Sequence, residues 1–330
     1  MDANYWLEMR RSGHRWNHNG NPIEPFEQFA RQGVERVRIR LWTGDTGVNG
    51  LRYATETARS AQEAGLEPYV VLFLSDDWAD YVKQPVPERW EGLSLSKQTD
   101  AVERYAERVA RHFREEGIKV VFYEIGNEID FGISGQFEKR WSHRFNLGWM
   151  KQEIWPRAAR IIDAAQTGIR NVEPEATFLL HLTQWWNPNF IEKFFRTMTD
   201  EGVSVDRIGL AYFPTADLGD GNRFRELGVA VEQLTAEIDR PVVIAETAYP
   251  STGEIEGQFA DWDQPVPGYP LTPSGQKQWV HDFIGFTQNQ SKIVEAYYWS
   301  PEWYVGPLWT AFSLFDESGH SKPALEALGR

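Results

Sequence analysis

Two glutamates follow two apolar runs that lie far apart in the sequence. Val120–Tyr123 is a short run of β-branched and aromatic residues, and Asn127 and Glu128 come soon after it. Pro241–Ala245 is a second apolar run, and Glu246 follows it directly. Because the carboxyl ends of parallel strands meet at one edge of a sheet, we expect the two glutamates to lie together. Two carboxyl groups about 5 Å apart can cleave a glycosidic bond with retention, one as nucleophile and one as acid/base.

A glutamate at a strand end also has a simpler interpretation, which is a salt bridge or a helix cap. For Glu128 or Glu246 alone that structural role is favoured, whereas the pair, with tryptophans around it, favours catalysis. The acid must keep its proton near neutral pH, which requires burial or a neighbouring like charge. The nucleophile must stay ionised, and Arg40, near the end of its strand, would supply a suitable cation. Arg38 is expected to be a structural ion-pair partner.

The elements that must position these groups alternate regularly along the chain. The predicted strands are Asn4–Met9, Arg36–Trp42, Glu67–Leu74, Val120–Tyr123, Ala176–Leu182, Arg207–Phe213, Pro241–Glu246 and Ile293–Trp299. The predicted helices are Pro25–Gln32, Leu51–Ala64, Lys97–Glu116, Trp149–Ala165, Phe190–Glu201, Phe224–Ile238, Ser274–Gln288 and Pro323–Leu328. Parallel strands linked by helices in this number close most naturally into a (β/α)8 TIM barrel, an α/β fold. A doubly wound open sheet is the alternative, but no glycine-rich phosphate loop follows a strand. No linker or short repeat divides the chain, so residues 1–330 are predicted to form a single catalytic domain.

Polar and aromatic side chains gather at the predicted strand ends, where the active face of a barrel lies. Fifteen tryptophans are an unusual number, and flat rings can stack on sugars or simply pack in a core. His181 is either a buried structural histidine or a substrate contact. The predicted substrate-binding residues are Arg40, Trp42, Asp76, Trp78, Asn127, His181, Trp185, Trp186, Tyr212, Trp299 and Trp303.

The composition limits the classes of molecule that the protein is expected to bind. A formal charge of −14 argues against nucleic acid and anionic membranes as partners. No apolar stretch approaches the length of a membrane-spanning helix. There is no cysteine, and His14 and His18 lie in a turn-rich segment without an intervening glutamate, so neither a metal nor another cofactor is predicted. Met1–Asn4 does not begin a signal peptide, so we expect either a cytoplasmic protein or a secreted one whose leader has been removed. The oligomeric state is left open.

Several motifs resemble glycoside hydrolase family 53, the endo-β-1,4-galactanases, within the clan A retaining barrels. Gly13–Trp42 is similar to the first βαβ unit of that family, and Ser75–Asp80 to its Ser-Asp-x-Trp-Ala-Asp loop. Ile125–Ile129 matches its acid/base motif, and Glu246–Pro250 matches its nucleophile motif. The segment Leu314–Gly319 is similar as well, so the resemblance runs along the whole chain.

This resemblance implies Glu128 as acid/base and Glu246 as nucleophile. It also implies that Asn127 contacts the sugar 2-hydroxyl, that Arg40 supports the nucleophile and that the Trp299 ring forms the floor of the central subsite. The implied substrate is an oligo- or polysaccharide, most simply a β-linked galactan cleaved internally. The alternatives are exo cleavage of another β-glycan, a carbohydrate-binding barrel without catalysis and a metal-dependent hydrolase.

The chain departs from the family pattern on the active face. Val71–Leu74 replaces Asp-Phe-His-Tyr, and Ala211–Pro214 replaces Ser-Tyr-Tyr-Pro. Ser300 stands where the family has the glutamate of Trp-Glu-Pro, and Gln184–Asn187 replaces Gly-Gly-Asp-Asn. Lost polar contacts to sugar hydroxyls change which sugar is accepted more than whether the bond is cut. The resemblance therefore predicts the mechanism better than the substrate.

Overall fold

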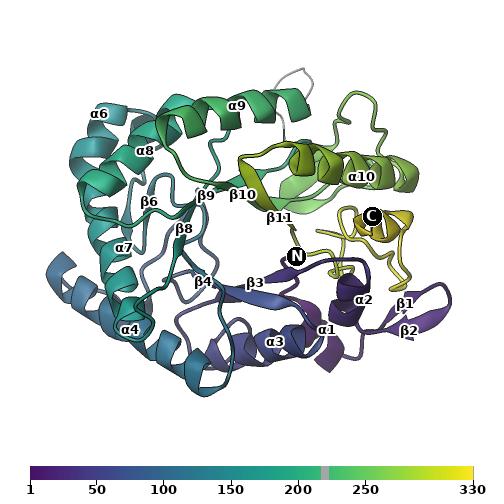
Figure 1. The fold of residues 1–330 in the computed structure, drawn as a ribbon, viewed down its shortest axis with the longest axis horizontal. Helices are drawn as coiled ribbons and strands as arrows, with labels where there is room; N and C mark the ends of the chain where they lie inside the picture. Colours follow the sequence, from purple (N-terminus) through teal and green to yellow (C-terminus); the bar gives the residue numbers. More distant parts are fainter. Residues whose placement is uncertain (217–222, 330) are drawn as a thin grey trace.

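Seven parallel strands form the central sheet of the computed structural model, which describes residues 1–216 and 223–329. The strands are β3 (Arg36–Leu41), β4 (Glu67–Leu72), β5 (Tyr123–Ile125), β8 (Phe178–Leu182), β9 (Arg207–Tyr212), β10 (Val242–Thr247) and β11 (Ile293–Tyr298). They pair in the order β11-β10-β9-β8-β5-β4-β3, and every neighbouring pair is parallel. The sheet curls round on itself inside a ring of helices (Figure 1).

Residues 1–4 close the gap between the two edge strands. The Asp2 backbone N–H donates to Tyr298 O at 2.9 Å, and the Arg38 N–H donates to Met1 O at 2.8 Å. The Asn4 side chain continues the ladder, because its Nδ2 donates to Arg38 O and its Oδ1 accepts from Arg40 N. This segment completes the ring in the position of the eighth strand, and the fold is a (β/α)8 barrel.

The predicted first strand Asn4–Met9 is wrong. Its place in the ring is taken by residues 1–4, which share only Asn4 with the predicted strand, and the helix α1 (Trp6–Arg11) begins two residues later. Trp6, Leu7 and Met9 are buried in α1, whereas Glu8 and Arg10 are exposed. An apolar spacing of this kind over six residues fits a helix face and a strand about equally, so the short segment was ambiguous.

Seven longer helices surround the sheet (Figure 1). They are α2 (Pro25–Arg31), α3 (Leu51–Glu63), α4 (Leu95–Glu115), α7 (Trp155–Arg170), α8 (Pro188–Asp200), α9 (Arg223–Glu237) and α10 (Pro273–Asn289). The helix predicted to begin at Trp149 instead starts six residues later, after α6 (Leu147–Trp149) and a π-helical turn at Met150–Ile154. The last predicted helix is a 3-10 helix, Pro323–Leu328. None of the described helices combines the length and the apolar character that a membrane-spanning helix needs.

Shorter elements lie in the connections between the barrel strands and the long helices. Two of them are hairpins, β1 (Trp16–His18) with β2 (Asn21–Ile23), and β6 (Gly132–Ile133) with β7 (Gln136–Phe137). The four-residue helix α5 (Trp141–Arg144) follows the second hairpin. Both the second hairpin and α5 belong to the connection after β5. Glu128 lies in the same connection, so these elements are at the same end of the barrel as Glu128.

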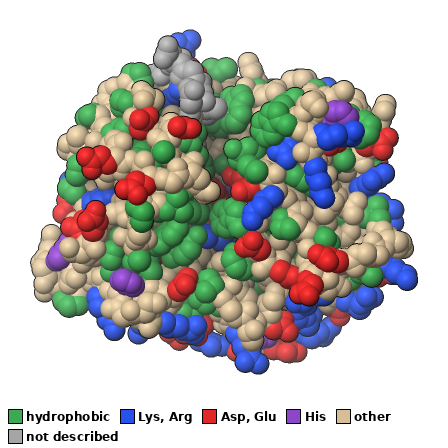
Figure 2. Space-filling view, turned by 180° about the vertical axis from the view of Figure 1, so that it is seen from behind, with side chains coloured by type: hydrophobic (Ala, Val, Ile, Leu, Met, Phe, Trp, Pro, Cys, Tyr) green, Lys and Arg blue, Asp and Glu red, His purple; other side chains and the backbone are tan. Residues whose placement is uncertain are grey.

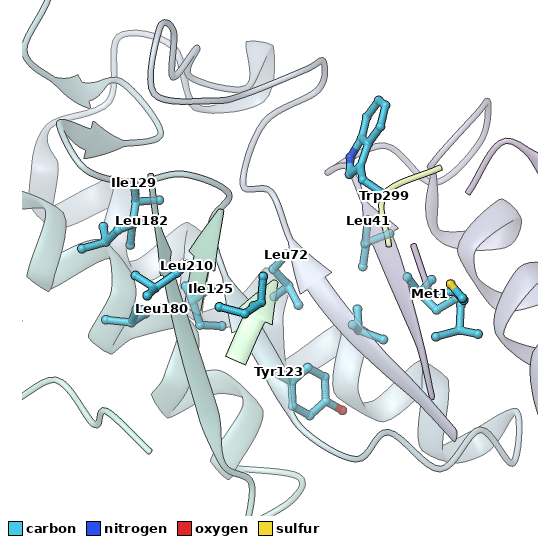
Figure 3. Packing of buried hydrophobic residues seen from close by; sticks show 14 of the residues in the cluster. Met1, Leu41, Leu72, Tyr123, Ile125, Ile129, Leu180, Leu182, Leu210 and Trp299 are labelled. Atoms are coloured by element: carbon cyan, nitrogen blue, oxygen red, sulfur yellow. The ribbon is translucent and has the colours of Figure 1, made fainter. Parts of the chain in front are cut away.

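Side chains alternate between two cores. Leu72, Ile125, Leu180 and Leu210 come from four neighbouring strands and pack side by side in the layer between sheet and helices (Figure 3). A separate cluster fills the inside of the barrel: Tyr69, Val71, Phe73, Ala79, Phe122, Leu179, Val243 and Tyr297. Residues of one strand alternate between these clusters, as the period of two along a strand requires. A side chain that reaches the barrel mouth must therefore occupy an inward register position.

Candidate active site

A β-bulge turns Glu246 into the barrel. In β10 the inward residue is Val243, while Val242 and Ile244 face the helices. Strict alternation would send residue 246 outward as well, but the pairing of β10 with β9 shifts register between Ile244 and Glu246. A bulge of this kind adds one residue and re-aims the next side chain. The buried Glu246 carboxyl consequently meets groups from the opposite side of the ring, above all Arg38.

Glu128 is held by a sharp turn after β5. Gly126 has a φ of 76°, and a Cβ there would lie 2.4 Å from Ile129 Cγ2, so only glycine fits. Glu128 itself has a φ of 49°, a left-handed conformation that costs a residue with a side chain about 1 kcal/mol or more. The side chain is buried, and its Oε2 accepts from the Tyr81 backbone N–H at 3.4 Å. Strain of this kind persists where surrounding structure fixes the backbone, as it does at many functional sites.

Arg38 is the centre of a buried charge network. Its Nη1 donates to Glu246 Oε1 at 2.6 Å and to Asp2 Oδ2 at 2.7 Å. Its Nε and Nη2 donate to the two carboxylate oxygens of Glu124 at 3.0 and 2.6 Å. Nη2 also donates to Asn127 Oδ1 at 2.7 Å. The rigid guanidinium therefore fixes Glu246 relative to β5 and to the segment that closes the ring.

The hydrogen bonds of Arg40 in the described residues go to groups other than Glu246. Its Nε and Nη2 donate to Asp2 Oδ1, and Nη2 also donates to Ser300 Oγ at 3.1 Å. The guanidinium lies 4.9 to 5.3 Å from the ring centres of Tyr5, Trp78 and Trp299 and is fully buried. Arg38 is thus the direct partner of the carboxylate, and Arg40 acts on it only through charge at longer range.

The two glutamates differ in how strongly they hold a proton. Burial raises the pKa of Glu128 well above its ordinary value, and the negative charges of Glu246, Asp80 and Asp130 raise it further. Burial also raises the pKa of Glu246 above its ordinary value, although the charges of Arg38, His181 and Arg40 oppose that rise. Glu246 is among the charges that raise the pKa of Glu128, so the two buried carboxyl groups interact. Because Arg38 donates directly to Glu246, a proton held by the pair is favoured on Glu128.

Replacing Arg38 by Met should destabilise the fold strongly. The substitution leaves three buried carboxylates, those of Asp2, Glu124 and Glu246, without their shared cation. Removing one partner of a buried ion pair typically costs about 3–5 kcal/mol, and urea unfolding should show a loss of this size. Arg59→Met is the matched control, because its ion pair with Glu116 is about half exposed and should contribute no more than about 1 kcal/mol. Equal losses in the two variants would contradict the role of Arg38.

Six predicted substrate residues contact the charge network, the aromatic rings beside it or the inner cluster. Trp42 packs on the inner cluster, and Trp78 contacts both clusters and meets Trp299 edge-on. Trp303 stacks on Tyr5, with ring centres 3.9 Å apart. The remaining two are fully buried: His181 Nδ1 lies 3.1 Å from Glu124 Oε1, and Asn127 Nδ2 donates to Ala79 O.

Several of these side chains present an unpaired polar atom. Within the described residues, no hydrogen-bond partner is present for Arg40 Nη1, Trp42 Nε1, His181 Nε2 or Trp299 Nε1, although all four atoms are buried. Buried polar atoms are almost always hydrogen-bonded, so a cluster of exceptions calls for an explanation. Hydroxyl groups of a bound sugar would satisfy donors of this kind. The surface is also hollowed near the centre of one face, with hydrophobic side chains gathered beside the hollow (Figure 2).

The contacts of four other predicted residues are made outside this network. Both carboxylate oxygens of Asp76 accept hydrogen bonds within the surrounding loops, from Thr43 Oγ1 and the Glu88 N–H. Tyr212 occupies an outward position of β9, and its ring stacks on Phe283 of α10. Trp185 packs edge-on against Tyr212 and is almost fully buried, whereas the neighbouring Trp186 is exposed. Strand alternation explains Tyr212, because Ile208 and Leu210 of the same strand also face the helices.

Sequence reasoning missed several buried acids. Glu124 binds Arg38, and its inward position could have been read from its alternation with Tyr123 and Ile125. Burial works against its ionisation, but Arg38 and His181 outweigh that effect and hold the pKa of Glu124 below its ordinary value. Asp130 accepts from the backbone N–H groups of Thr183 and Gln184 and so holds the loop after β8. No local signal marked Asp130, because its partners lie more than fifty residues away.

Glu302 is another missed acid, and it should make the stability of the protein depend on pH. Its Oε1 accepts from the Tyr5 N–H at 2.8 Å, its Oε2 has no partner in the described residues, and burial raises its pKa to about 8. The pKa of Glu302 is therefore higher in the folded than in the unfolded chain. The contribution of Glu302 to the free energy of unfolding is complete below the unfolded-state pKa, and it is lost as the pH rises toward 8.

Glu302→Gln keeps the acceptor for Tyr5 but carries no charge. We expect its free energy of unfolding, relative to the wild type, to improve steadily between pH 5 and pH 8. The improvement should be at most about 1.4 kcal/mol per pH unit, as urea unfolding at both pH values would measure. The exposed Glu317 provides the control variant Glu317→Gln, which should show no such trend. A pH-independent difference for Glu302→Gln would contradict the assignment.

The site offers no metal centre of the usual kind. No group of three or more His, Cys, Asp or Glu side chains that could hold a metal ion occurs in residues 1–216 and 223–329. Its chemistry is that of two interacting carboxyl groups, a buried guanidinium and a set of indole rings. This combination can supply a proton, a nucleophile and stacking surfaces for a sugar.

Comparison with known proteins identifies the family. The sequence pattern of glycosyl hydrolase family 53 matches residues 1–328. An arabinogalactan endo-β-1,4-galactanase of Cellvibrio japonicus is 25% identical, and the match covers 96% of this chain and 85% of that protein. A fungal β-1,4-galactanase structure superposes with a TM-score of 0.84 at 22% identity, covering 99% of this chain and 97% of the other. The family 53 catalytic domain of Ignisphaera aggregans gives 0.82 at 23% identity, with 99% and 93% covered. The chain therefore belongs to glycosyl hydrolase family 53 and is a glycoside hydrolase.

Proposed function

We propose that the protein hydrolyses a β-linked, galactan-type glycan with retention of configuration, using Glu246 as nucleophile and Glu128 as acid/base. The observation that carries this proposal is the interacting carboxyl pair. Glu246 is bound by Arg38 at 2.6 Å, while the pKa of the buried Glu128 is raised well above its ordinary value. One acid keeps a proton and the other has a cation at hand, which are the two states that a retaining glycosidase requires.

The proposed reaction has two steps. In the first, a Glu246 oxygen bonds to the anomeric carbon while the glycosidic bond breaks, and Glu128 gives its proton to the departing oxygen. In the second, a water molecule gives a proton to Glu128 and bonds to the anomeric carbon, and Glu246 leaves as a carboxylate. Each step inverts the anomeric carbon, so the product keeps the configuration of the substrate.

The galactan assignment rests on the relatives, since the protein of Cellvibrio japonicus is an arabinogalactan endo-β-1,4-galactanase. Internal cleavage is proposed from the same relative, whose activity is endo cleavage. Trp78, Trp299 and Trp303 lie together, with ring centres 6.1 Å apart from Trp78 to Trp299 and from Trp299 to Trp303, and this group of rings offers a stacking surface for a sugar. Exo cleavage of another β-glycan remains the competing proposal, because the active-face substitutions at Val71–Leu74 and Ala211–Pro214 remove polar side chains.

Two measurements test the proposal. NMR spectra recorded during hydrolysis of an oligomer of β-1,4-linked galactose should show the β-anomer of the new reducing end before mutarotation. Chromatography of the products from polymeric β-1,4-galactan should show a ladder of oligomers if cleavage is internal and one short product if it is terminal. Initial release of the α-anomer would overturn the mechanism, and hydrolysis of another β-glycan in preference to galactan would overturn the substrate assignment.

A further inference from the structure

Exposed hydrophobic side chains concentrate on one side of the barrel mouth. Among the described residues, eight large hydrophobic side chains are exposed. Six of them come from the loop after β4, the connection after β5 and the loop after β8: Tyr81, Val82, Leu93, Trp141, Phe145 and Trp186. These three segments follow neighbouring strands of the sheet. Single exposed apolar residues are ordinary, but a group of this kind indicates a binding surface.

Trp141 and Phe145, at the two ends of α5, are the most exposed aromatic side chains of this group, with 59% and 47% of their surfaces accessible. We call these two side chains the α5 platform. Their ring centres lie 6.0 Å apart, and both rings meet the fully buried ring of Phe131, at 6.3 and 5.3 Å. Phe190 of α8 packs beneath as well, 5.8 Å from Phe131. The platform is therefore supported from below by buried aromatic side chains.

Arg144 holds the platform in place. Its guanidinium lies 4.8 Å from the ring centre of Trp141, and the side chain is 4% exposed. The three donor nitrogens bond backbone carbonyls at 3.0 Å: Nε to Glu138 O, Nη1 to Tyr81 O and Nη2 to Val82 O. A planar guanidinium bonded at every nitrogen is rigid, and it fixes the ring that it contacts. The entropy cost of ordering Trp141 on binding a ligand is thereby reduced.

The same arginine connects the platform to the proposed acid. Tyr81, whose carbonyl accepts from Arg144, donates its backbone N–H to Glu128 Oε2. Glu128 as acid must face the oxygen that joins the cleaved sugar to its leaving group. The leaving portion of the glycan therefore departs on the Glu128 side, where the platform stands.

From these contacts, and resting on the proposed function, we infer that the α5 platform is a binding subsite for sugar residues of the leaving portion of a β-glycan. The apolar faces of pyranose rings stack on exposed indole and phenyl rings. The continuity of the platform with Glu128 through Arg144 and Tyr81 favours a glycan over a second copy of this chain. Trp186, exposed just before the cap Asn187 of the helix that carries Phe190, extends the surface along the same edge.

Affinity electrophoresis through gels that contain polymeric β-1,4-galactan, xylan, mannan or mixed-linkage glucan tests this inference. The wild type should be retarded by its glycan, and the double variant Trp141→Ala, Phe145→Ala should bind at least about fivefold more weakly. Trp141→Phe, which keeps a ring, should recover part of the retardation. Val229→Ala, an exposed apolar side chain on α9, is the matched control and should bind as the wild type does. Thermal unfolding should confirm that each variant is folded.

The possible outcomes separate the two proposals. Equal retardation of the wild type and the double variant would overturn the inference that the α5 platform is a binding subsite and would leave the proposed function untouched. A wild type that no glycan retards would also overturn the platform, whereas turnover of aryl β-glycosides would still test the chemistry at Glu246. If light scattering shows a wild-type dimer that the double variant breaks into monomers, the surface joins two copies of the chain and the inference is wrong.

Discussion

Replacing Glu246 by Gln should lower kcat on the galactan substrate by at least about 10⁴-fold while the protein stays folded. The amide cannot form the glycosyl ester, and the proposed acid Glu128 alone does not provide a second path. The glutamine side chain at position 246 keeps an acceptor oxygen for Arg38, so the buried network retains most of its contacts. Reducing-sugar release gives the rate, and circular dichroism with thermal unfolding checks the fold.

The role of Glu246 can be separated from a general loss of activity. In Glu246→Ala, added azide should restore turnover and give an α-configured glycosyl azide, because azide attacks from the side that the carboxylate has vacated. Glu254→Gln is the matched control, since Glu254 is an exposed glutamate in the loop after β10 and its variant should keep the wild-type rate. Wild-type activity in Glu246→Gln, or a β-configured azide from Glu246→Ala, would refute the assignment.

Replacing Glu128 by Gln should lower kcat on galactan by about 10²–10⁴-fold, the usual value of a general acid. The loss in kcat/KM should be much smaller for a dinitrophenyl β-galactoside, because that leaving group departs without a proton. Glycosyl-enzyme should then accumulate and give a burst of dinitrophenol, since the second step still lacks its base. Stopped-flow absorbance measures the burst.

The pH profile provides the second test of Glu128. The pKa of the Glu128 carboxyl is raised well above its ordinary value, and the proposed reaction uses its protonated form. The kcat/KM of the wild type should therefore fall as pH rises through that raised pKa, and the fall should be absent in Glu128→Gln. In Glu128→Ala, azide should yield the β-configured glycosyl azide, opposite to the Glu246 variant. A variant that keeps the alkaline fall would show that another group provides the proton.

Much of the barrel could be predicted because its elements are long and strongly periodic. The strands from Arg36 onward and most helices lie within a few residues of their expected bounds. Glu128 follows β5 and Glu246 lies near the end of β10, the two strands that were expected to carry them. The short segments were less certain. Six residues in α1 and the π-helical turn before α7 depend on tertiary contacts that a local pattern does not contain.

The details of the site could not be predicted, because they depend on side-chain direction across the ring. The bulge before Glu246 changes the direction of one side chain, and nothing in the local sequence marks it. Arg38 and Arg40 share one face of β3, so the sequence alone could not decide which contacts Glu246. Tyr212 was placed at the mouth from its position at a strand end, whereas its register position faces the helices. The single-domain assignment for residues 1–330 and the individual substrate contacts remain predictions.

Closure of the ring by residues 1–4 links catalytic competence to the order in which the chain folds. Asp2 pairs beside Trp299, and the Tyr5 N–H binds Glu302, so the two sides of this seam are nearly three hundred residues apart in sequence. Contacts of such long separation are slow to form, because a large loop must close before they contribute. Asp2 also binds the guanidinium that holds Glu246. During refolding, recovery of turnover should therefore lag behind recovery of helix content, and enzymatic activity becomes a direct reporter of whether the barrel has sealed.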